Sequence, residues 1–168
     1  MDVKSLKRYI GRKDVYAKQT DKGSYICVRE PITDELLDKH LKGEITIGTY
    51  LIRKDGLINF AAIDLDGEKT DLVSLKRISI AIYSLFPDFT RTLEFSGRRG
   101  YHIWIFPETP YKPSILRMII KSRLKRIGIG GSIEIYPKQN KLSGSELGNQ
   151  IKLPCGKHKK GGWSTIIK

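Results

Sequence analysis

Two acidic residues interrupt an apolar run in the middle of the chain, Asn59-Phe60-Ala61-Ala62-Ile63-Asp64-Leu65-Asp66-Gly67. Side chains alternate between the two faces of a strand, so Asp64 and Asp66 would project from the same face, roughly 6.6 Å apart along the chain. Like charges at that separation raise each other's pKa unless a cation lies between them. A hard divalent metal ion is the simplest such cation, so the pair predicts a metal site. The alternative is an Asp-x-Asp at the solvated end of a strand.

A second polar cluster, Ser96-Gly97-Arg98-Arg99-Gly100-Tyr101-His102, offers phosphate-binding chemistry. Its glycines let backbone N–H groups approach a ligand, and the adjacent guanidinium groups of Arg98 and Arg99 offer forked donors suited to phosphate oxygens. On its own, such a turn is more often an exposed hairpin tip. Beside two metal-binding aspartates, it is better interpreted as a phosphate cradle.

The elements around these clusters follow the order of a split βαβ fold. Strands are expected at 57–66, 91–95, 101–106 and 132–136, and helices at 71–86 and 113–128. This β-α-β-β-α-β order is that of ferredoxin-like and RNA-recognition-motif (RRM) folds, so the fold class is α/β (α+β). In that topology the first and third strands are central neighbours, the fourth lies beside the first, and both helices cover one face.

Alternation along these strands sorts the side chains between the two faces of the sheet. The apolar set expected under the helices is Ile63, Leu65, Ile103, Ile105, Ile133 and Ile135. The set expected on the opposite, open face is Asp64, Asp66, His102, Trp104 and Glu134. Three carboxylates and a histidine therefore converge, which makes Glu134 a third candidate metal ligand. The alternative for His102 is a hydrogen-bonded sheet histidine without a functional role.

An N-terminal α/β unit at 1–56 precedes the RRM-like module at 57–168, and the 168 residues are expected to form a single domain. The unit is expected to contain a helix at 2–10, a strand at 24–29, and a helix that Thr33 caps. Strands at 46–52 and 57–66 flank Arg53-Lys54-Asp55-Gly56, whose Asp-Gly pair is a hairpin signal. Two antiparallel strands are therefore expected to deliver the acidic pair.

Positive charge is concentrated in the second half of the chain. Residues 1–88 carry 15 Lys and Arg against 14 Asp and Glu, whereas residues 89–168 carry 16 against 4. A one-sided field is typical of a nucleic-acid or polyphosphate partner, and the alternative is a solubilising surface. The basic C-terminal loop of Lys157, His158, Lys159 and Lys160 is expected to bind nucleic-acid phosphates, and the alternative is a solvated loop.

The sequence contains no apolar run long enough to span a bilayer, and its basic, amphipathic start lacks the apolar core of a signal peptide. A cytoplasmic protein without a membrane partner is therefore expected. Cys27 and Cys155 are isolated and match neither a disulfide framework nor a zinc-ligand spacing.

Three of these motifs resemble those of the archaeo-eukaryotic primase (primase-polymerase) superfamily. Asp64-Leu65-Asp66, the segment at 96–104 and Ile133-Glu134-Ile135 look like its acidic pair, its serine-to-histidine motif and its lone acid. The segments at 40–43, 46–50, 136–139 and 148–158 are similar to the branch that includes CRISPR-associated primase-polymerases and the primases of TOTE conflict systems. The resemblance covers most of the chain. Glutamate stands at Glu134, where the family often has aspartate.

The resemblance implies template-directed transfer of nucleotides from dNTPs or NTPs to a 3′-hydroxyl on a single-stranded DNA template and primer, with release of pyrophosphate. De novo primer synthesis is an option within the same family. Asp64, Asp66 and Glu134 would hold two Mg²⁺ or Mn²⁺ ions, one for the attacking hydroxyl and one for the triphosphate. CRISPR adaptation or helicase proteins are the protein partners that the branch implies.

The same resemblance assigns nucleotide contacts to several other residues. The nucleotide's phosphates would be bound by Ser96, Arg98, Arg99 and His102, with Lys138 and Lys152 as additions. Tyr50 would pack against a sugar. Independently of the resemblance, an aromatic side chain such as Trp104 on the sheet face is suited to stack on a base, and the alternative for both residues is a purely structural place in the sheet.

Two other classes of function remain open. A metal-dependent nuclease or phosphohydrolase uses the same carboxylate cluster with water as the nucleophile. A non-catalytic RRM-like domain would bind nucleic acid through exposed aromatic side chains on the sheet. The face expected here is mostly carboxylate, which repels nucleic acid unless metal ions intervene.

Overall fold

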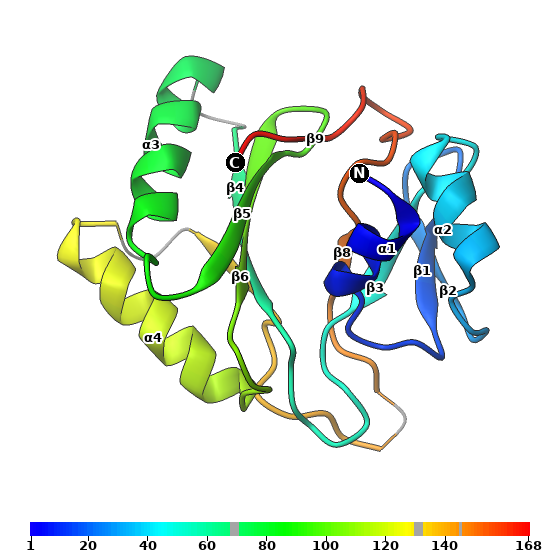
Figure 1. The fold of residues 1–168 in the computed structure, drawn as a ribbon, viewed down its shortest axis with the longest axis horizontal. Coiled ribbons are helices and arrows are strands. Elements are labelled where there is room, and N and C mark those ends of the chain that lie inside the picture. The colour runs from blue at the N-terminus through cyan, green and yellow to red at the C-terminus, as the bar shows by residue number, and fades with distance from the viewer. Residues whose placement is uncertain (68–70, 130–132, 145) are drawn as a thin grey trace.

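The computed structural model describes residues 1–67, 71–129, 133–144 and 146–168. Within these ranges the chain forms two antiparallel sheets, with the helices α3 (Leu72–Ser84) and α4 (Pro113–Arg126) on the outer side of the larger sheet (Figure 1). No helix in this part of the chain has the length and apolar character needed to cross a membrane.

The larger sheet has the split βαβ topology expected from the sequence. Its strands are, in spatial order, β7 (Glu134–Tyr136), β4 (Ala61–Asp66), β6 (Gly100–Phe106), β5 (Thr90–Phe95) and β9 (Thr165–Ile166). The central neighbours are β4 and β6, with β7 beside β4, which confirms the predicted order. Ser132, the first residue of the expected fourth strand, lies outside the described residues. The added edge strand β9 was not expected.

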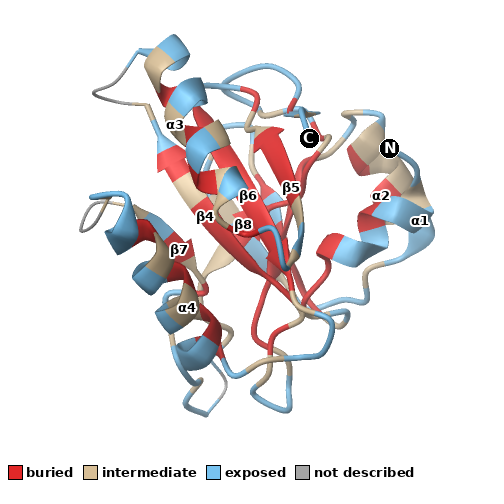
Figure 2. Ribbon diagram, turned by 60° about the vertical axis from the view of Figure 1, so that its left-hand side comes forward, coloured by how far each residue is buried: buried red, intermediate tan, exposed pale blue. Residues whose placement is uncertain are grey.

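The apolar face of this sheet lies under the two helices, as alternation predicted. Cross-strand register aligns Ile63 with Ile103 on one side and with Ile135 on the other, and all three are buried. Leu75 and Ile82 of α3 join the same core. Figure 2 shows buried central strands and helices that are exposed on their outer sides. Burial of this apolar layer is the main force that holds the helices on the sheet.

The smaller sheet takes strands from both ends of the chain. Its order is β2 (Tyr25–Val28), β1 (Tyr16–Gln19), β3 (Ile47–Tyr50) and β8 (Gln150–Lys152). The helix α1 (Val3–Leu6), the 3-10 turn η1 (Lys7–Tyr9) and the helix α2 (Asp34–Leu41) accompany it. Thr33 caps α2 as expected, because its hydroxyl accepts a hydrogen bond from the N–H of Leu36 at 3.2 Å.

The prediction that the strands within residues 46–66 pair as a hairpin is wrong. The strand β3 pairs with β1 and β8 in the smaller sheet, whereas β4 pairs with β6 and β7 in the larger one. A turn does form, since the N–H of Gly56 donates to the Arg53 carbonyl at 3.0 Å. The flanking residues Ile52, Ile58 and Phe60 are buried, so apolar burial between the two layers outweighs the local hairpin signal.

The second face of the larger sheet is partly covered rather than open. Tyr9 packs edge-on against Trp104 and Phe106, with ring centroids 5.0 and 5.2 Å apart. Trp104 is 0% exposed, so the base-stacking role suggested for it is wrong. The N-terminal turn covers that end of the face because it carries apolar residues of its own. The other end remains accessible, with 27% of the Asp64 side chain and 56% of the Asp66 side chain exposed.

Candidate active site

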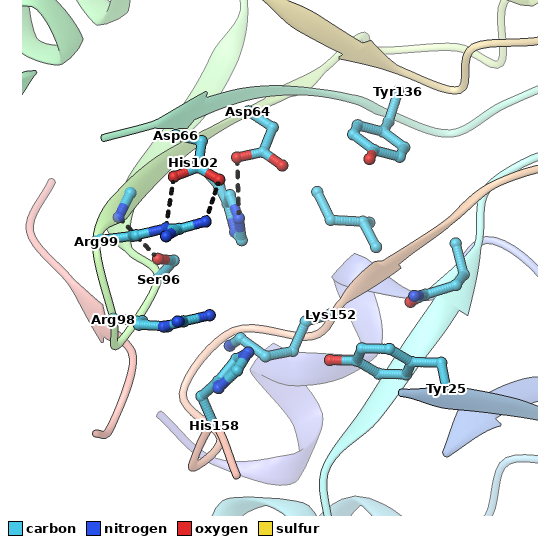
Figure 3. Close-up of a pocket in the computed structure, with 13 residues that line it drawn as sticks. Tyr25, Asp64, Asp66, Ser96, Arg98, Arg99, His102, Tyr136, Lys152 and His158 are labelled. Carbon is cyan, nitrogen blue, oxygen red and sulfur yellow. Dashed lines mark hydrogen bonds and ion pairs between the residues drawn. The ribbon is translucent and has the colours of Figure 1, made fainter. Parts of the chain in front are cut away.

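A cavity of about 220 Å³ lies between the accessible end of the larger sheet and the smaller sheet (Figure 3). The larger sheet contributes Asp64, Asp66, His102 and Tyr136 to its walls. The turn between β5 and β6 contributes Ser96, Arg98 and Arg99. The smaller sheet and the C-terminal loop contribute Tyr25, Gln150, Lys152 and His158. The fold thus brings together side chains that are distant in the sequence.

Asp64 and Asp66 project from the same face of β4, as predicted. Register aligns Asp64 with His102 on one side and Glu134 on the other, so all three acids lie on the face opposite the helices. The Arg99 Nε donates to Asp66 Oδ1 at 2.9 Å. The His102 Nε2 lies 3.5 Å from Asp64 Oδ1. Basic side chains of the protein therefore face both aspartates.

The Asp64 carboxyl has a raised pKa. Burial is the largest cause, and the negative charges of Glu134 and Asp66 raise the pKa further, whereas His102 lowers it. A carboxylate that is disfavoured by neighbouring acids gains most from a cation beside it. The donor chemistry of this pair therefore fits a hard divalent metal ion.

Glu134 shares this face, but its carboxylate is engaged by other side chains. Lys138 Nζ donates to Glu134 Oε1 at 2.6 Å, and the Tyr136 hydroxyl donates to Oε2 at 2.9 Å. Across the described ranges, no three His, Cys, Asp or Glu side chains gather as metal ligands. A three-carboxylate site therefore stays a prediction, and so does phosphate binding by Lys138, which pairs here with Glu134.

A buried acid that was not expected from the sequence, Glu94 of β5, holds His102 in place. Glu94 is 0% exposed and lies directly opposite His102 in the sheet. Its Oε2 accepts hydrogen bonds from His102 Nδ1 at 3.0 Å and from Trp104 Nε1 at 2.8 Å. Because Nδ1 donates its hydrogen bond to this carboxylate, Nε2 is the ring atom of His102 that faces Asp64.

Lys152 completes this network from the smaller sheet. Its Nζ lies 3.4 Å from Glu94 Oε1 and donates to the Leu153 carbonyl and to Ser164 Oγ, both at 3.0 Å. Burial alone would raise the pKa of Glu94, but the positive charges of Lys152 and His102 lower it to about 2. Lys152 lines the cavity, and its ammonium group acts as the buried counterion of Glu94, so phosphate binding by Lys152 stays a prediction.

The turn between β5 and β6 forms a basic wall because the C-terminal loop packs on it. Ser96 Oγ accepts a hydrogen bond from the N–H of Gly100 at 3.2 Å, which closes the turn. Gly97 has a φ of +90°, and a Cβ there would lie 2.6 Å from the Gly162 carbonyl oxygen. Glycine at this position thus permits the loop's close approach, which brings His158 near Arg98 (Figure 3).

The four basic residues of the C-terminal loop point in different directions. His158 lines the cavity, and burial lowers its pKa, as do the charges of Lys152 and Arg98. Lys159 Nζ lies 3.1 Å from an Asp21 carboxylate oxygen. The side chain of Lys160 packs over Gly23, and that of Lys157 lies beside Gly43. Template binding by this loop stays a prediction.

The aromatic residues of the cavity differ from those chosen from the sequence. Tyr50 is 8% exposed and packs with Val15 and Ala17, so it takes the structural place that was its alternative. Tyr25 and Tyr136 line the cavity instead. The sequence predicts a short strand around Tyr25 but not the strand with which it pairs. It therefore did not indicate that Tyr25 lines the cavity.

Comparison with known proteins identifies the family. Residues 4–167 match the family model described as the archaeo-eukaryotic primase domain of the TOTE conflict system. The chain belongs to this family. This primase domain is also similar to the polymerase domain of Mycobacterium tuberculosis ligase D, solved in complex with DNA, with a TM-score of 0.60 and 15% identity. The match covers 95% of this chain and 75% of that one, and it shows a shared fold.

Membership confirms the resemblance seen in the sequence motifs and supports a nucleotidyl-transfer type of function for the primase domain. The family model describes a conflict system, so an association with CRISPR proteins stays a prediction. A search among curated proteins gave no match.

Proposed function

We propose that this domain is a template-directed primase-polymerase that transfers nucleotides from dNTPs or NTPs to a 3′-hydroxyl. The observation that carries the proposal is the division of the cavity into an acidic and a basic side. Asp64 and Asp66 lie along one side, and Arg98, Lys152 and His158 lie along the other (Figure 3). A metal-bound triphosphate needs the same two surfaces, carboxylates for the cations and basic groups for the phosphates.

Mg²⁺ or Mn²⁺ ions, held by Asp64 and Asp66 with Glu134 as a further ligand, would supply Lewis-acid activation of the attacking hydroxyl and neutralise the leaving pyrophosphate. The protein's own groups orient the nucleotide. Arg98 presents a guanidinium from an exposed turn, and such a fork suits phosphate oxygens. His102 presents Nε2 from a ring that Glu94 fixes, so little ordering is needed when a phosphate binds.

A single-stranded DNA template and a primer are the proposed macromolecular partners. Lys157 and Lys160 lie on the exposed surface of the loop that also carries His158. Positive charges beside a catalytic cavity attract the phosphate backbone and release its counterions.

The test is synthesis on a circular single-stranded DNA template with labelled dNTPs or NTPs and Mg²⁺ or Mn²⁺, with and without an annealed primer. Primer extension supports the proposal, and products without a primer demonstrate de novo priming. Template shortening without synthesis would instead establish the metal-dependent nuclease.

Substitution of the aspartates sharpens this test. Asp64→Asn and Asp66→Asn should each reduce synthesis by at least about 100-fold, which corresponds to about 2.7 kcal/mol of transition-state stabilisation. Glu108→Gln is the matched control, because it neutralises an exposed acid outside the cavity. Asp64→Asn activity within about threefold of wild type would contradict the metal assignment, provided that thermal unfolding is unchanged.

A further inference from the structure

A second cavity, of about 380 Å³, lies near the far end of β2 from the catalytic cavity. Cationic side chains dominate its walls, which include Arg12, Arg29, Arg53, Lys54 and Lys141 together with the acid Glu146. These residues are separate from the site described above. A concave surface with this excess of positive charge favours an anionic ligand.

Neighbouring carboxylates hold two of the three arginines of this cavity without cancelling its charge. Arg12 donates two hydrogen bonds of 2.7 Å to Asp14, and Lys54 lies 3.1 Å from the same carboxylate. Arg53 donates to Asp55 at 2.5 Å. Even when these two carboxylates and the acid in the wall are counted, five cations face three anions. Guanidinium groups held in this way are pre-organised for phosphate oxygens.

One edge strand joins the two cavities. Tyr25, at the start of β2, lines the catalytic cavity, and Arg29, just past its end, lines the second one. Cys27 lies between them and is exposed. Alternation places the three residues on one face, and the distance along the strand from the first to the last is about 13 Å.

Each cavity has a partly buried apolar side chain in its wall, and the two side chains pack on one small apolar cluster. Tyr25 and Leu147 pack against the buried group of Val15, Ala17 and Tyr50, and Leu147 also lines the second cavity. Single-stranded nucleic acid binds to this combination of features, because bases stack on aromatic side chains while cations contact the phosphates.

The chain from β7 to β8, like β2, contributes residues to both cavities. Tyr136 and Gln150, near its two ends, line the catalytic cavity, whereas Lys141 and Leu142 line the second cavity. Two separate parts of the chain therefore connect the cavities, which makes them neighbours along one surface.

We infer that the second cavity binds a backbone phosphate of a single nucleic-acid strand that extends into the catalytic cavity across the face of β2. A stacked strand rises about 3.4 Å per nucleotide, so a path of about 13 Å corresponds to about four nucleotides. The inference rests on the proposed function in one respect, namely that the strand is the template.

The test measures binding of fluorescein-labelled oligothymidines by fluorescence anisotropy, without metal ions or nucleotides. A failed synthesis assay therefore leaves the result intact. The variant is Arg29→Ala/Lys141→Ala, in which both side chains are exposed. The matched control, Lys121→Ala/Lys125→Ala, removes equal charge from the exposed side of α4, beyond the larger sheet (Figure 1).

We expect Arg29→Ala/Lys141→Ala to weaken binding of an eight-nucleotide strand by about fivefold or more. The salt dependence, log K against log [salt], should become shallower by about 0.7 for each phosphate that the variant no longer neutralises. The control variant should stay within about twofold of wild type, because its charges lie away from the path. A dinucleotide cannot reach both cavities, so all three proteins should bind it equally.

Three outcomes would overturn the inference. Equal weakening by the test and control variants would reveal a general charge effect. Equal weakening for the dinucleotide would remove the link to a path between cavities. Loss of affinity for fluorescent ATP without loss for the eight-nucleotide strand would assign the cavity to a free nucleotide. If alanine lowers the melting temperature, Arg29→Gln/Lys141→Gln replaces it, because glutamine retains most of the side-chain length.

Discussion

The substitution Glu94→Gln tests the buried charges that hold His102. The Glu94 carboxylate accepts hydrogen bonds from His102 and Trp104, and Lys152 lies on its other side. Its pKa is lowered from 4.5 to about 2. At 1.36 kcal/mol per pKa unit, that shift favours the charged form by about 3 kcal/mol. Removal of one partner from a buried ion pair generally costs about 3–5 kcal/mol, which agrees with this value.

We expect Glu94→Gln to lower the free energy of unfolding by about 3 kcal/mol, measured by urea denaturation at pH 7. Glu108→Gln neutralises an exposed acid and should change it by less than about 0.5 kcal/mol. Glu94→Gln/Lys152→Met removes both charges, so part of the lost stability should return. A loss below about 1 kcal/mol for Glu94→Gln, or no recovery in the double variant, would refute a charged network at this position.

Three further predictions concern other contacts. Arg99→Ala should weaken nucleotide binding more than template binding, because Arg99 lies beside Asp66 in the cavity; equal losses in titrations with each ligand would contradict this. Gly156→Ala should cost about 1–3 kcal/mol of unfolding free energy, since its Cβ would lie 2.1 Å from His40 Cε1. Gly162→Ala is the control for that measurement, because its Cβ would lie 3.4 Å from the Gly97 carbonyl oxygen, an ordinary contact distance. Burial lowers the pKa of His40 from 6.5 to about 4, so the unfolded chain takes up this proton first as pH falls. Between pH 7 and pH 5 the wild type should therefore lose about 2 kcal/mol more unfolding free energy than His40→Gln, measured by urea denaturation at each pH. If both proteins lose the same amount, His40 is not buried in its neutral form.

The larger sheet could be predicted because short-range patterns in the sequence determine its elements and faces. Alternation separates Ile63 from Asp64, and the period of α3 places Leu75 and Ile82 toward the sheet, so element order alone determines the topology. The smaller sheet could not be predicted in this way. Its strand β8 joins β3 across about a hundred residues, and no local signal specifies such a pairing.

The place of Glu94 opposite His102 follows from the register of a short hairpin. The four-residue separation of Ser96 from Gly100 sets the register of the hairpin, and that register aligns Glu94 with His102. An acid between Leu93 and Phe95, opposite a candidate catalytic histidine, indicates a buried partner. The presence of Lys152 beside it could not be foreseen, because Lys152 belongs to the other sheet.

The position of Glu134 shows where prediction from strand alternation ends. Register determines the face from which a side chain projects, and Glu134 projects from the predicted one, beside Asp64. It does not determine which partner the carboxylate reaches at the end of three rotatable bonds. Tyr136 is two residues away on the same face of β7, and Lys138 is four residues away. The Glu134 side chain can therefore accept hydrogen bonds from the Tyr136 hydroxyl and the Lys138 ammonium group. A metal ion would compete with these local donors for the carboxylate, and the outcome depends on charges contributed by Asp64 and Asp66 from another strand. Sequence pattern thus specifies the sheet face of each acid, whereas the ligand geometry depends on a balance of contacts between strands.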